Sequence, residues 1–161
     1  MAMSPIAFDS ISPEIPCLML SPRGGLEDLL GSFPHSRKGG LIEACDCEEA
    51  CQALRRNTIA VVLAETDLPD GGWRDLQILL ASDPSHPKLV VLLEKGQEDY
   101  RAQLILHGAF DAVPVTAAPS LIASAVTSAY IAWLKERWMT LAARQNSRAA
   151  IAAGAGAITV Q

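Results

Sequence analysis

Long apolar runs are missing from this chain of 161 residues. No stretch reaches the roughly 20 consecutive apolar residues that a membrane-spanning helix needs. Residues 1–16 also lack a basic segment followed by an apolar run, which is the pattern of a secretory signal peptide. We therefore expect a cytoplasmic protein that makes no contact with a membrane.

An excess of basic residues is missing as well. The formal net charge at pH 7 is -5, whereas general nucleic-acid binders carry a positive field that attracts phosphate. We therefore do not expect nucleic acid as a partner of this chain. Hydrophobic residues make up 50% of the sequence, which suits one globular domain with a core of its own.

Motifs of catalytic and metal sites are also absent. The chain contains no P-loop, no glycine-rich dinucleotide motif, no G-x-S-x-G and no H-E-x-x-H. Three of the four cysteines, Cys45, Cys47 and Cys51, lie close together, but a zinc site needs a fourth ligand. Cys47 and Cys51 have helical i, i+4 spacing, so we interpret them as reduced cysteines, half-buried on an apolar helix face. We predict neither an enzyme nor a cofactor or metal.

Five apolar runs alternate with segments of helical spacing. The predicted strands are residues 15–20, 39–44, 58–64, 89–93 and 110–115. The third and fourth are apolar throughout, which is typical of strands buried on both faces of a parallel sheet. The helical patterns between them cover residues 26–33, 46–57, 73–80 and 97–107.

Local signals support several of these helices. Asp46, with Glu49 three residues later, forms a capping-box pattern. In the fourth helix we expect Tyr100 and Leu104 to point inward. A last helix is predicted to begin at Pro119 and to continue to about residue 144.

Five alternations of strand and helix imply a parallel sheet with helices on both faces. We predict a flavodoxin-like, doubly wound sheet of five strands in the order 2-1-3-4-5, with an extended C-terminal helix. The fifth strand is then an edge strand, which suits Pro114, because proline cannot donate to a sheet ladder. We divide the chain into an N-terminal segment (1–14), a domain (15–134), an extension of the last helix (135–145) and a flexible Ala- and Gly-rich tail (146–161).

The stretch V-V-L-A-E-T-D-L-P-D-G-G at residues 61–72 resembles the receiver domain of response regulators, the CheY-like family. In that family an apolar strand leads to Asp-x-x-(Met/Leu)-Pro and then to a glycine. Residues 107–112, H-G-A-F-D-A, are similar to the Ala-Gly-Ala before the fifth strand, and Pro87 precedes the fourth strand as in the family. The resemblance covers about residues 15–133 and implies a module of phosphorelay signal transduction in a two-component system.

The residues that carry the phosphoryl chemistry of the family do not match. The resemblance places the phosphoacceptor aspartate at Glu65, whose extra methylene moves the carboxylate. The acidic pair that holds Mg²⁺ falls in residues 20–23, L-S-P-R, which contain no carboxylate. The remaining family positions, a Thr or Ser, a Lys and a Pro, fall at Leu92 or Leu93, Val115 and Thr116. These departures indicate a degenerate pseudo-receiver that is not phosphorylated at Glu65.

Glu65 has two interpretations. It is either a fixed negative charge that holds the domain in one state, or a solvated loop carboxylate without a role. We hypothesise an ion pair between Arg23 and Glu65, because the first and third strands are expected to be neighbours.

Asp67 offers an alternative phosphoacceptor, because it precedes Leu68-Pro69. It stands two residues late, so we expect it in the loop after the third strand. Phosphorylation there would make the protein a working phosphorelay receiver that needs Mg²⁺. The competing interpretation is that Asp67 and Asp70 are loop residues that cap the next helix.

The last helix is the best functional lead, because it carries two apolar stripes. The first, which we expect to face the sheet, consists of Ile122, Val126, Ala129 and Trp133. The second has the 3, 4, 3 spacing of an a/d seam and consists of Ile131, Leu134, Trp138 and Leu141. We predict that this seam binds a protein partner or a second copy, which gives a homodimer. The alternatives are that the extension folds back onto its own domain or is a remnant of a linker.

Three functions follow from these observations. The first, which we predict, is a stand-alone pseudo-receiver that acts through protein contacts in a signalling pathway. The second is a receiver phosphorylated at Asp67. The third is a truncated relative of the pseudo-receivers whose long last helix leads into a three-helix RNA-binding antiterminator domain, which the chain resembles up to about residue 144.

Overall fold

The computed structural model describes residues 15–22, 41–68 and 71–158. The helix predicted at residues 26–33, as well as Arg23 and Asp70, lies outside the described residues.

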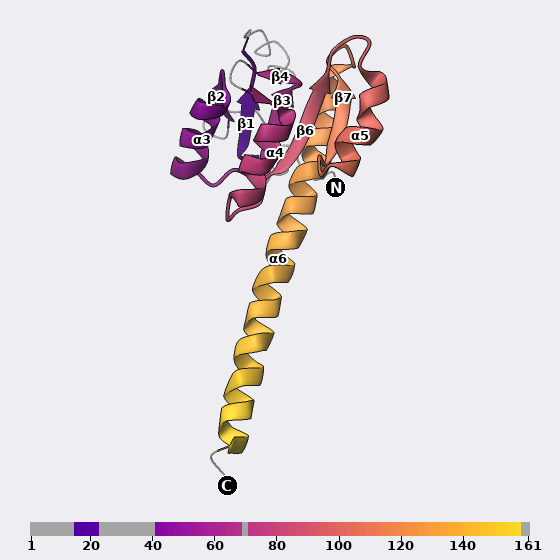
Figure 1. Ribbon diagram of the computed structural model, residues 1–161. Helices are drawn as coiled ribbons and strands as arrows, with labels where there is room; N and C mark the ends of the chain where they lie inside the picture. Colours follow the sequence, from indigo (N-terminus) through magenta and orange to yellow (C-terminus); the bar gives the residue numbers. More distant parts are fainter. Residues whose placement is uncertain (1–14, 23–40, 69–70, 159–161) are drawn as a thin grey trace, which may run out of the picture.

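A five-stranded sheet forms the centre of the fold (Figure 1). Its strands are β1 (Cys17–Leu20), β2 (Leu41–Ala44), β3 (Val61–Glu65), β6 (Lys88–Leu93) and β7 (Asp111–Pro114). Their order is β2-β1-β3-β6-β7 and every pairing in this sheet is parallel. This is the predicted doubly wound order, with the proline-containing strand at an edge, so the predicted fold class is confirmed.

Two of the inner strands, β3 and β6, illustrate burial on both faces. In β3, Val62 and Ala64 belong to one apolar layer, while Val61 and Leu63 belong to the other. β6 alternates in the same way along its length. Successive side chains of a strand point to opposite faces, so two covered faces require an unbroken apolar run. The sequence has such a run at both places.

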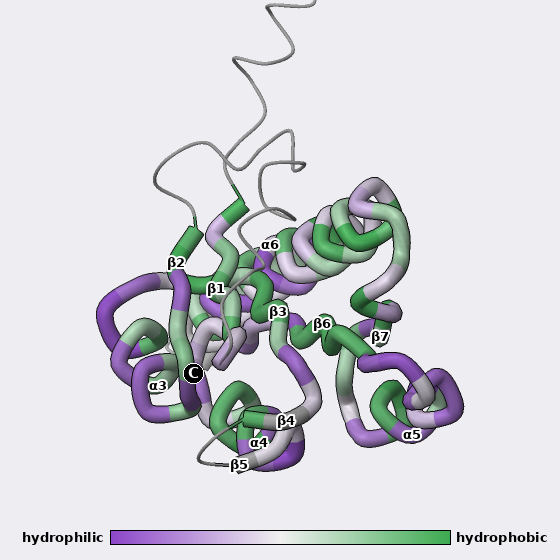
Figure 2. The backbone as a smooth tube through the Cα atoms, turned by 90° about the horizontal axis from the view of Figure 1, so that it is seen from above, coloured by the Kyte–Doolittle hydropathy of each residue, from purple (hydrophilic) through white to green (hydrophobic). Residues whose placement is uncertain are grey.

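Helices cover both faces of the sheet. Seen from above, α3 (Cys47–Arg56), α4 (Trp73–Ser82) and α5 (Arg101–Leu106) lie on one side, and α6 (Pro119–Ile158) lies on the other (Figure 2). α3 begins as predicted, because the side chain of its N-cap Asp46 accepts a hydrogen bond from the N–H of Glu49 at 2.8 Å. The Glu49 carboxylate in turn accepts the N–H of Cys45 at 2.7 Å.

The prediction for Tyr100 is wrong. Tyr100 ends a 3₁₀ turn, η1 (Glu98–Tyr100), and is 52% exposed, whereas Leu104 is buried as predicted. A 3₁₀ turn has three residues per turn instead of 3.6. The tighter winding therefore takes Tyr100 off the inward stripe of α5.

The loop after β3 contains a short hairpin that the sequence analysis does not predict. β4 (Asp67–Leu68) pairs antiparallel with β5 (Gly71–Gly72), with Asp67 opposite Gly72. Leu68 is buried in the layer that contains Ala64. Burial of this side chain helps to hold the hairpin against the carboxyl end of the sheet.

α6 packs on the sheet through the predicted stripe. Ile122, Val126, Ala129 and Trp133 are all buried and belong to the layer of Val61 and Leu63. Beyond Trp133 the helix leaves the domain and projects away from the sheet (Figure 1).

The prediction that the helix ends near residue 144 is wrong, because α6 continues to Ile158. The Ala-rich sequence after Asn146 has no apolar stripe, which is why we predicted a flexible tail. Alanine has the highest helix propensity, and extending an existing helix costs less than starting one. The segment therefore continues the helix without help from packing. Among the helices that the structure describes, none has both the length and the apolar composition needed to span a bilayer.

The packing of α6 can be tested with two neighbouring residues. Ile122 is 0% exposed and Leu121 is 55% exposed. We expect Ile122→Ala to lower the free energy of unfolding in urea by about 2–5 kcal/mol, because it leaves a cavity between helix and sheet. Leu121→Ala, the matched control, should change it by less than about 0.5 kcal/mol. Equal losses would show that α6 does not pack on the sheet in this orientation.

Candidate functional site

Glu65 is the last residue of β3, at the carboxyl end of the sheet. Its side chain is half-buried, and Oε1 accepts a hydrogen bond from the hydroxyl of Ser21 at 3.3 Å. The contact arises because β1 and β3 are parallel neighbours, with Leu20 opposite Ala64. Ser21 and Glu65 each follow one of these two residues, so their side chains lie at the same end of the sheet. The carboxylate is held by a neutral hydroxyl, in a long hydrogen bond.

The resemblance places the family's acidic pair within residues 20–23, where Ser21 and Pro22 directly follow β1. Neither residue carries a carboxylate. The hypothetical ion pair of Arg23 with Glu65 involves a residue outside the described part of the chain, so it stays a hypothesis.

The resemblance places the family's hydroxyl at Leu92 or Leu93 and its lysine at Val115, and all three side chains are apolar. Leu92 lies opposite Glu65 in the ladder and is buried in one layer, whereas Leu93 is buried in the other. Either residue places a hydrocarbon side chain at the end of β6. Val115 packs against the layer of Leu92, and Thr116 is exposed. Leu92, Leu93 and Val115 therefore supply neither a cation nor a hydroxyl group to the surroundings of Glu65.

The backbone of Asp67 lies in β4, past the end of β3, and not at the strand terminus. The N-cap of α4 is Gly72, whose N–H donates to Asp75 Oδ2 at 3.2 Å. Asp67 is therefore not the N-cap of this helix, and the part of that interpretation that concerns Asp70 lies outside the described residues. Asp75, inside the first turn, takes the helix-start role that we assigned to them.

A hydrogen-bonded group that the sequence analysis missed lies beside Glu65. The buried Thr66 donates its hydroxyl proton to Gln97 Oε1 at 3.0 Å, and the N–H of Glu94 donates to the same oxygen at 3.1 Å. Gln97 thus links the residue after β3 to the residue after β6. Thr66 and Gln97 are 31 positions apart, and no local pattern marks such a pair.

The donors at this edge do not fit a resident magnesium ion of the receiver type. Mg²⁺ prefers carboxylate oxygens and near-octahedral geometry. Among the described side chains, this edge offers the carboxylate of Glu65, which already accepts from Ser21, but no acidic pair on β1. Within the described ranges, no group of three or more His, Cys, Asp or Glu side chains lies close enough to hold a metal.

The cysteines have three different environments. Cys45 is exposed, Cys47 and Cys51 are half-buried on α3, and Cys17 is buried in β1. None of the four forms a disulfide bond. Burial raises the pKa of the Cys17 thiol to about 12, whereas the pKa of Cys45 is raised chiefly by the negative charge of Glu49.

The predicted seam of α6 is exposed. The exposed fractions are 47% for Ile131, 41% for Leu134, 75% for Trp138 and 49% for Leu141. The sheet-facing stripe lies on another side of the helix, so the extension does not fold back onto the described part of its own domain through this seam. Met139 is also exposed but points to a different side of the helix, since it is one residue past Trp138.

Known proteins share this fold without close similarity of sequence. The sequence matches no protein-family model and no curated protein. A response-regulator receiver domain from Clostridium thermocellum is 15% identical, with a TM-score of 0.63 over 78% of this chain and 98% of that one. The beryllofluoride-activated receiver domain of NtrC4, solved as a dimer, is 14% identical, with a TM-score of 0.62 over 73% and 97%.

A third similar structure is the receiver domain of Ssk1 from Saccharomyces cerevisiae, solved with the histidine phosphotransfer protein Ypd1. It is 15% identical, with a TM-score of 0.61 over 73% of this chain and 89% of that one. These similarities show that the chain has the receiver fold, as the resemblance of its motifs implied.

The buried thiol gives a prediction for alkaline pH. The ordinary pKa of 9.0 applies to Cys17 in the unfolded chain, and about 12 applies in the folded one. Between these values the unfolded chain releases the proton and the folded chain keeps it, so the free energy of unfolding falls as pH rises. We expect this fall to be steeper in the wild type than in Cys17→Ala, by up to about 1.4 kcal/mol per pH unit. Urea unfolding at pH 8, 9 and 10 measures both slopes, and parallel slopes would contradict burial of this thiol.

Proposed function

We propose that the protein is a signal-transduction module of the response-regulator type that acts through protein contacts without being phosphorylated. The observation that carries this proposal is the composition of the carboxyl edge. Glu65 stands where receivers have their phosphoacceptor and is bonded to Ser21, while Leu92, Leu93 and Val115 take the places of the polar groups. The edge keeps the receiver fold, and at these described positions it lacks the charges that receivers use.

Electrostatics explains why these losses act together. An acyl phosphate carries nearly two negative charges where the carboxylate carried one, in a place that is partly buried. Charges a few ångströms apart interact strongly where water is scarce. Receivers offset this repulsion with Mg²⁺ and a lysine. Here a serine, a proline and a valine occupy the corresponding positions, so these positions would not compensate the charge of an acyl phosphate.

In this proposal Glu65 supplies a constant negative charge in place of a switchable one. Its contact with Ser21 and the link from Thr66 through Gln97 to Glu94 tie together the ends of β1, β3 and β6. The ends of these strands would then keep one arrangement. A module of this kind signals by its presence and by its partners instead of by a phosphorylation state.

The partner surface in this proposal is the seam of Ile131, Leu134, Trp138 and Leu141, with a second copy of the chain as its partner. The four side chains repeat with the a/d spacing at which two helices interlock. All are large and are 41–75% exposed, and together they form an apolar strip that is costly to leave in water. Similar receiver structures include a dimer and a complex with a phosphotransfer protein, which supports a contact between proteins as the mode of action.

Phosphorylation can be tested directly. We expect no mass increase when the protein is incubated with acetyl phosphate and Mg²⁺. We also expect Glu65→Asp to stay unmodified, because restoring the aspartate does not restore the acidic pair or the lysine. Intact-protein mass spectrometry measures both.

The alternative phosphoacceptor has its own signature in the same assay. A gain of one phosphoryl group that disappears in Asp67→Asn would replace the proposed function with a working receiver. A gain in Glu65→Asp alone would show that the missing polar groups are not needed.

The proposed dimer can be tested with two adjacent residues of α6. Light scattering of the wild type should give twice the chain mass of 17.1 kDa. Trp138→Glu should give the monomer mass, because a charge at the centre of an apolar seam is costly to bury. Met139→Glu, also exposed but off the seam, is the matched control and should remain a dimer. A monomeric wild type, or equal effects of the two substitutions, would remove the seam from the proposal.

A further inference from the structure

A groove lies at the amino end of the sheet, at the opposite end from Glu65. Its volume is about 530 Å³, and it is open on one side. One wall consists of Thr58, before β3, and residues 84–86, before β6. The other wall is the part of α6 that leaves the domain, from Trp133 to Arg144. We propose that the protein binds an acidic peptide segment of a partner protein in this groove. This proposal rests on the proposed function, because it takes contact between proteins as the mode of action.

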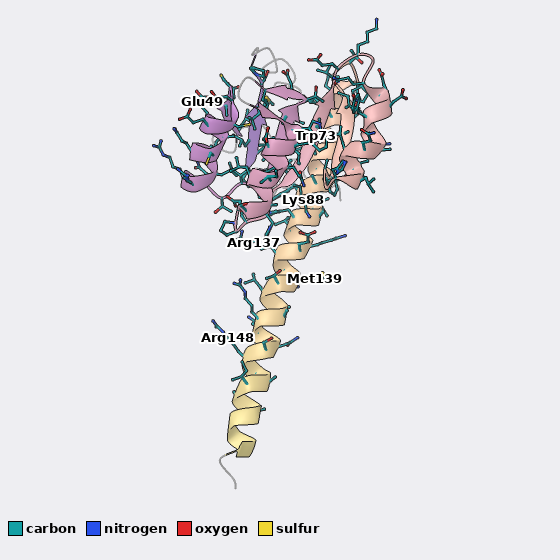
Figure 3. All side chains as sticks on the ribbon, viewed as in Figure 1. Glu49, Trp73, Lys88, Arg137, Met139 and Arg148 are labelled. Carbon is teal, nitrogen blue, oxygen red and sulfur yellow. The ribbon has the colours of Figure 1, made fainter. Side chains whose placement is uncertain are left out.

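The stripe of α6 that faces the sheet changes character at this groove. Ile122, Val126, Ala129 and Trp133 are buried against the sheet. The same stripe, continued with helical spacing of 4, 3 and 4, is formed by Arg137, Thr140 and Arg144, which all line the groove. The two arginines therefore lie on the face of α6 turned toward the domain. Figure 3 shows Arg137 at the place where α6 leaves the domain, near Lys88.

Specific contacts hold the two walls of the groove together near Trp133. The indole N–H of Trp133 donates to the carbonyl oxygen of Ser85 at 2.8 Å. The guanidinium of Arg137 lies 5.0 Å from the centre of the Trp133 ring. His86, next to Ser85, has a φ of 49°, in the left-handed region that non-glycine residues rarely adopt. Because these groups are already ordered, binding would lose little side-chain entropy here.

The charge of the groove is positive. Glu136 is the acidic residue in its lining, and its Oε1 is paired with Lys88 Nζ at 2.5 Å. Neither Arg137 nor Arg144 forms an ion pair with a residue in the part of the chain that the structure describes. The nearby Asp83 accepts hydrogen bonds from the N–H and hydroxyl of Ser85 within its own loop. Two guanidinium groups are thus left to attract an anion.

The spacing and the walls favour a peptide as the anion. Arg137 and Arg144 are two turns apart, which is roughly 10 Å along the helix axis. Carboxylates three residues apart in a polyproline II segment are separated by about 9 Å and lie on one side. Arginine binds carboxylates in forked pairs, and Leu141 gives the groove an apolar wall for the residues between them. A peptide with two carboxylates carries fewer negative charges than a nucleic acid, so the net charge of -5 on the whole chain repels it less.

The probe for this proposal is a fluorescein-labelled peptide, Gly-Glu-Pro-Leu-Glu-Gly, added to the intact protein. Fluorescence anisotropy should show binding that weakens with added salt. Arg137→Gln and Arg144→Gln should each weaken it by roughly fivefold. Lys135→Gln removes the same charge from the same helix outside the groove and should change it by less than about twofold. Arg144 makes no hydrogen bond or ion pair with a described residue, so Arg144→Gln tests the groove without a risk to folding.

Several results would overturn the proposal. The first is that the peptide does not bind at millimolar protein concentration. The second is that Lys135→Gln and Arg137→Gln weaken the binding equally. The third is that a peptide with Gln in place of Glu binds as tightly as the original. Tighter binding of pyrophosphate or of a 12-nucleotide RNA at the same arginines would assign the groove to another ligand. The phosphodonor and light-scattering assays do not depend on the groove. If the peptide does not bind but those two assays give the expected results, only the proposal for the groove is refuted.

Discussion

The orientation of α6 depends on one packing interaction, the burial of Ile122, Val126, Ala129 and Trp133 against the sheet. This stripe sets the rotation of the helix about its own axis. Once the rotation is set, every later residue of α6 has a defined direction. The apolar seam around Trp138 then lies on a different side of α6 from the sheet-facing stripe, with Leu141 also lining the groove, and Arg137 points back toward the loops at the amino end of the sheet. Two surfaces of different chemistry therefore follow from one contact.

The two ends of the sheet have separate roles in this arrangement. At the carboxyl end, Ser21, Glu65 and the link from Thr66 to Gln97 join neighbouring strands through hydrogen bonds. At the amino end, the indole of Trp133 joins α6 to the loop before β6. The inner strands between them are buried on both faces and closely packed.

The fold was predictable because its signals are local or strictly periodic. The unbroken apolar runs of β3 and β6, the proline of β7 and the Asp46 cap each report one backbone environment. The length of α6 was not predictable from periodicity, because alanine propensity extends it where no apolar stripe exists. Tyr100 was misplaced because a 3₁₀ turn has a different period. At the candidate site, Glu65 was located by its motif, whereas the pair of Thr66 and Gln97 joins distant loops and leaves no pattern in the sequence.

The part of α6 beyond Trp133 acts mechanically as a lever arm. From Trp133 to Ile158 the helix extends about 37 Å at 1.5 Å per residue. A tilt of about 5° at its base would move its tip by roughly 3 Å. The base is braced on one side by the Lys88–Glu136 pair and the Trp133 indole. A small change in the loop around His86 would thus be amplified into a displacement at the far end of the helix.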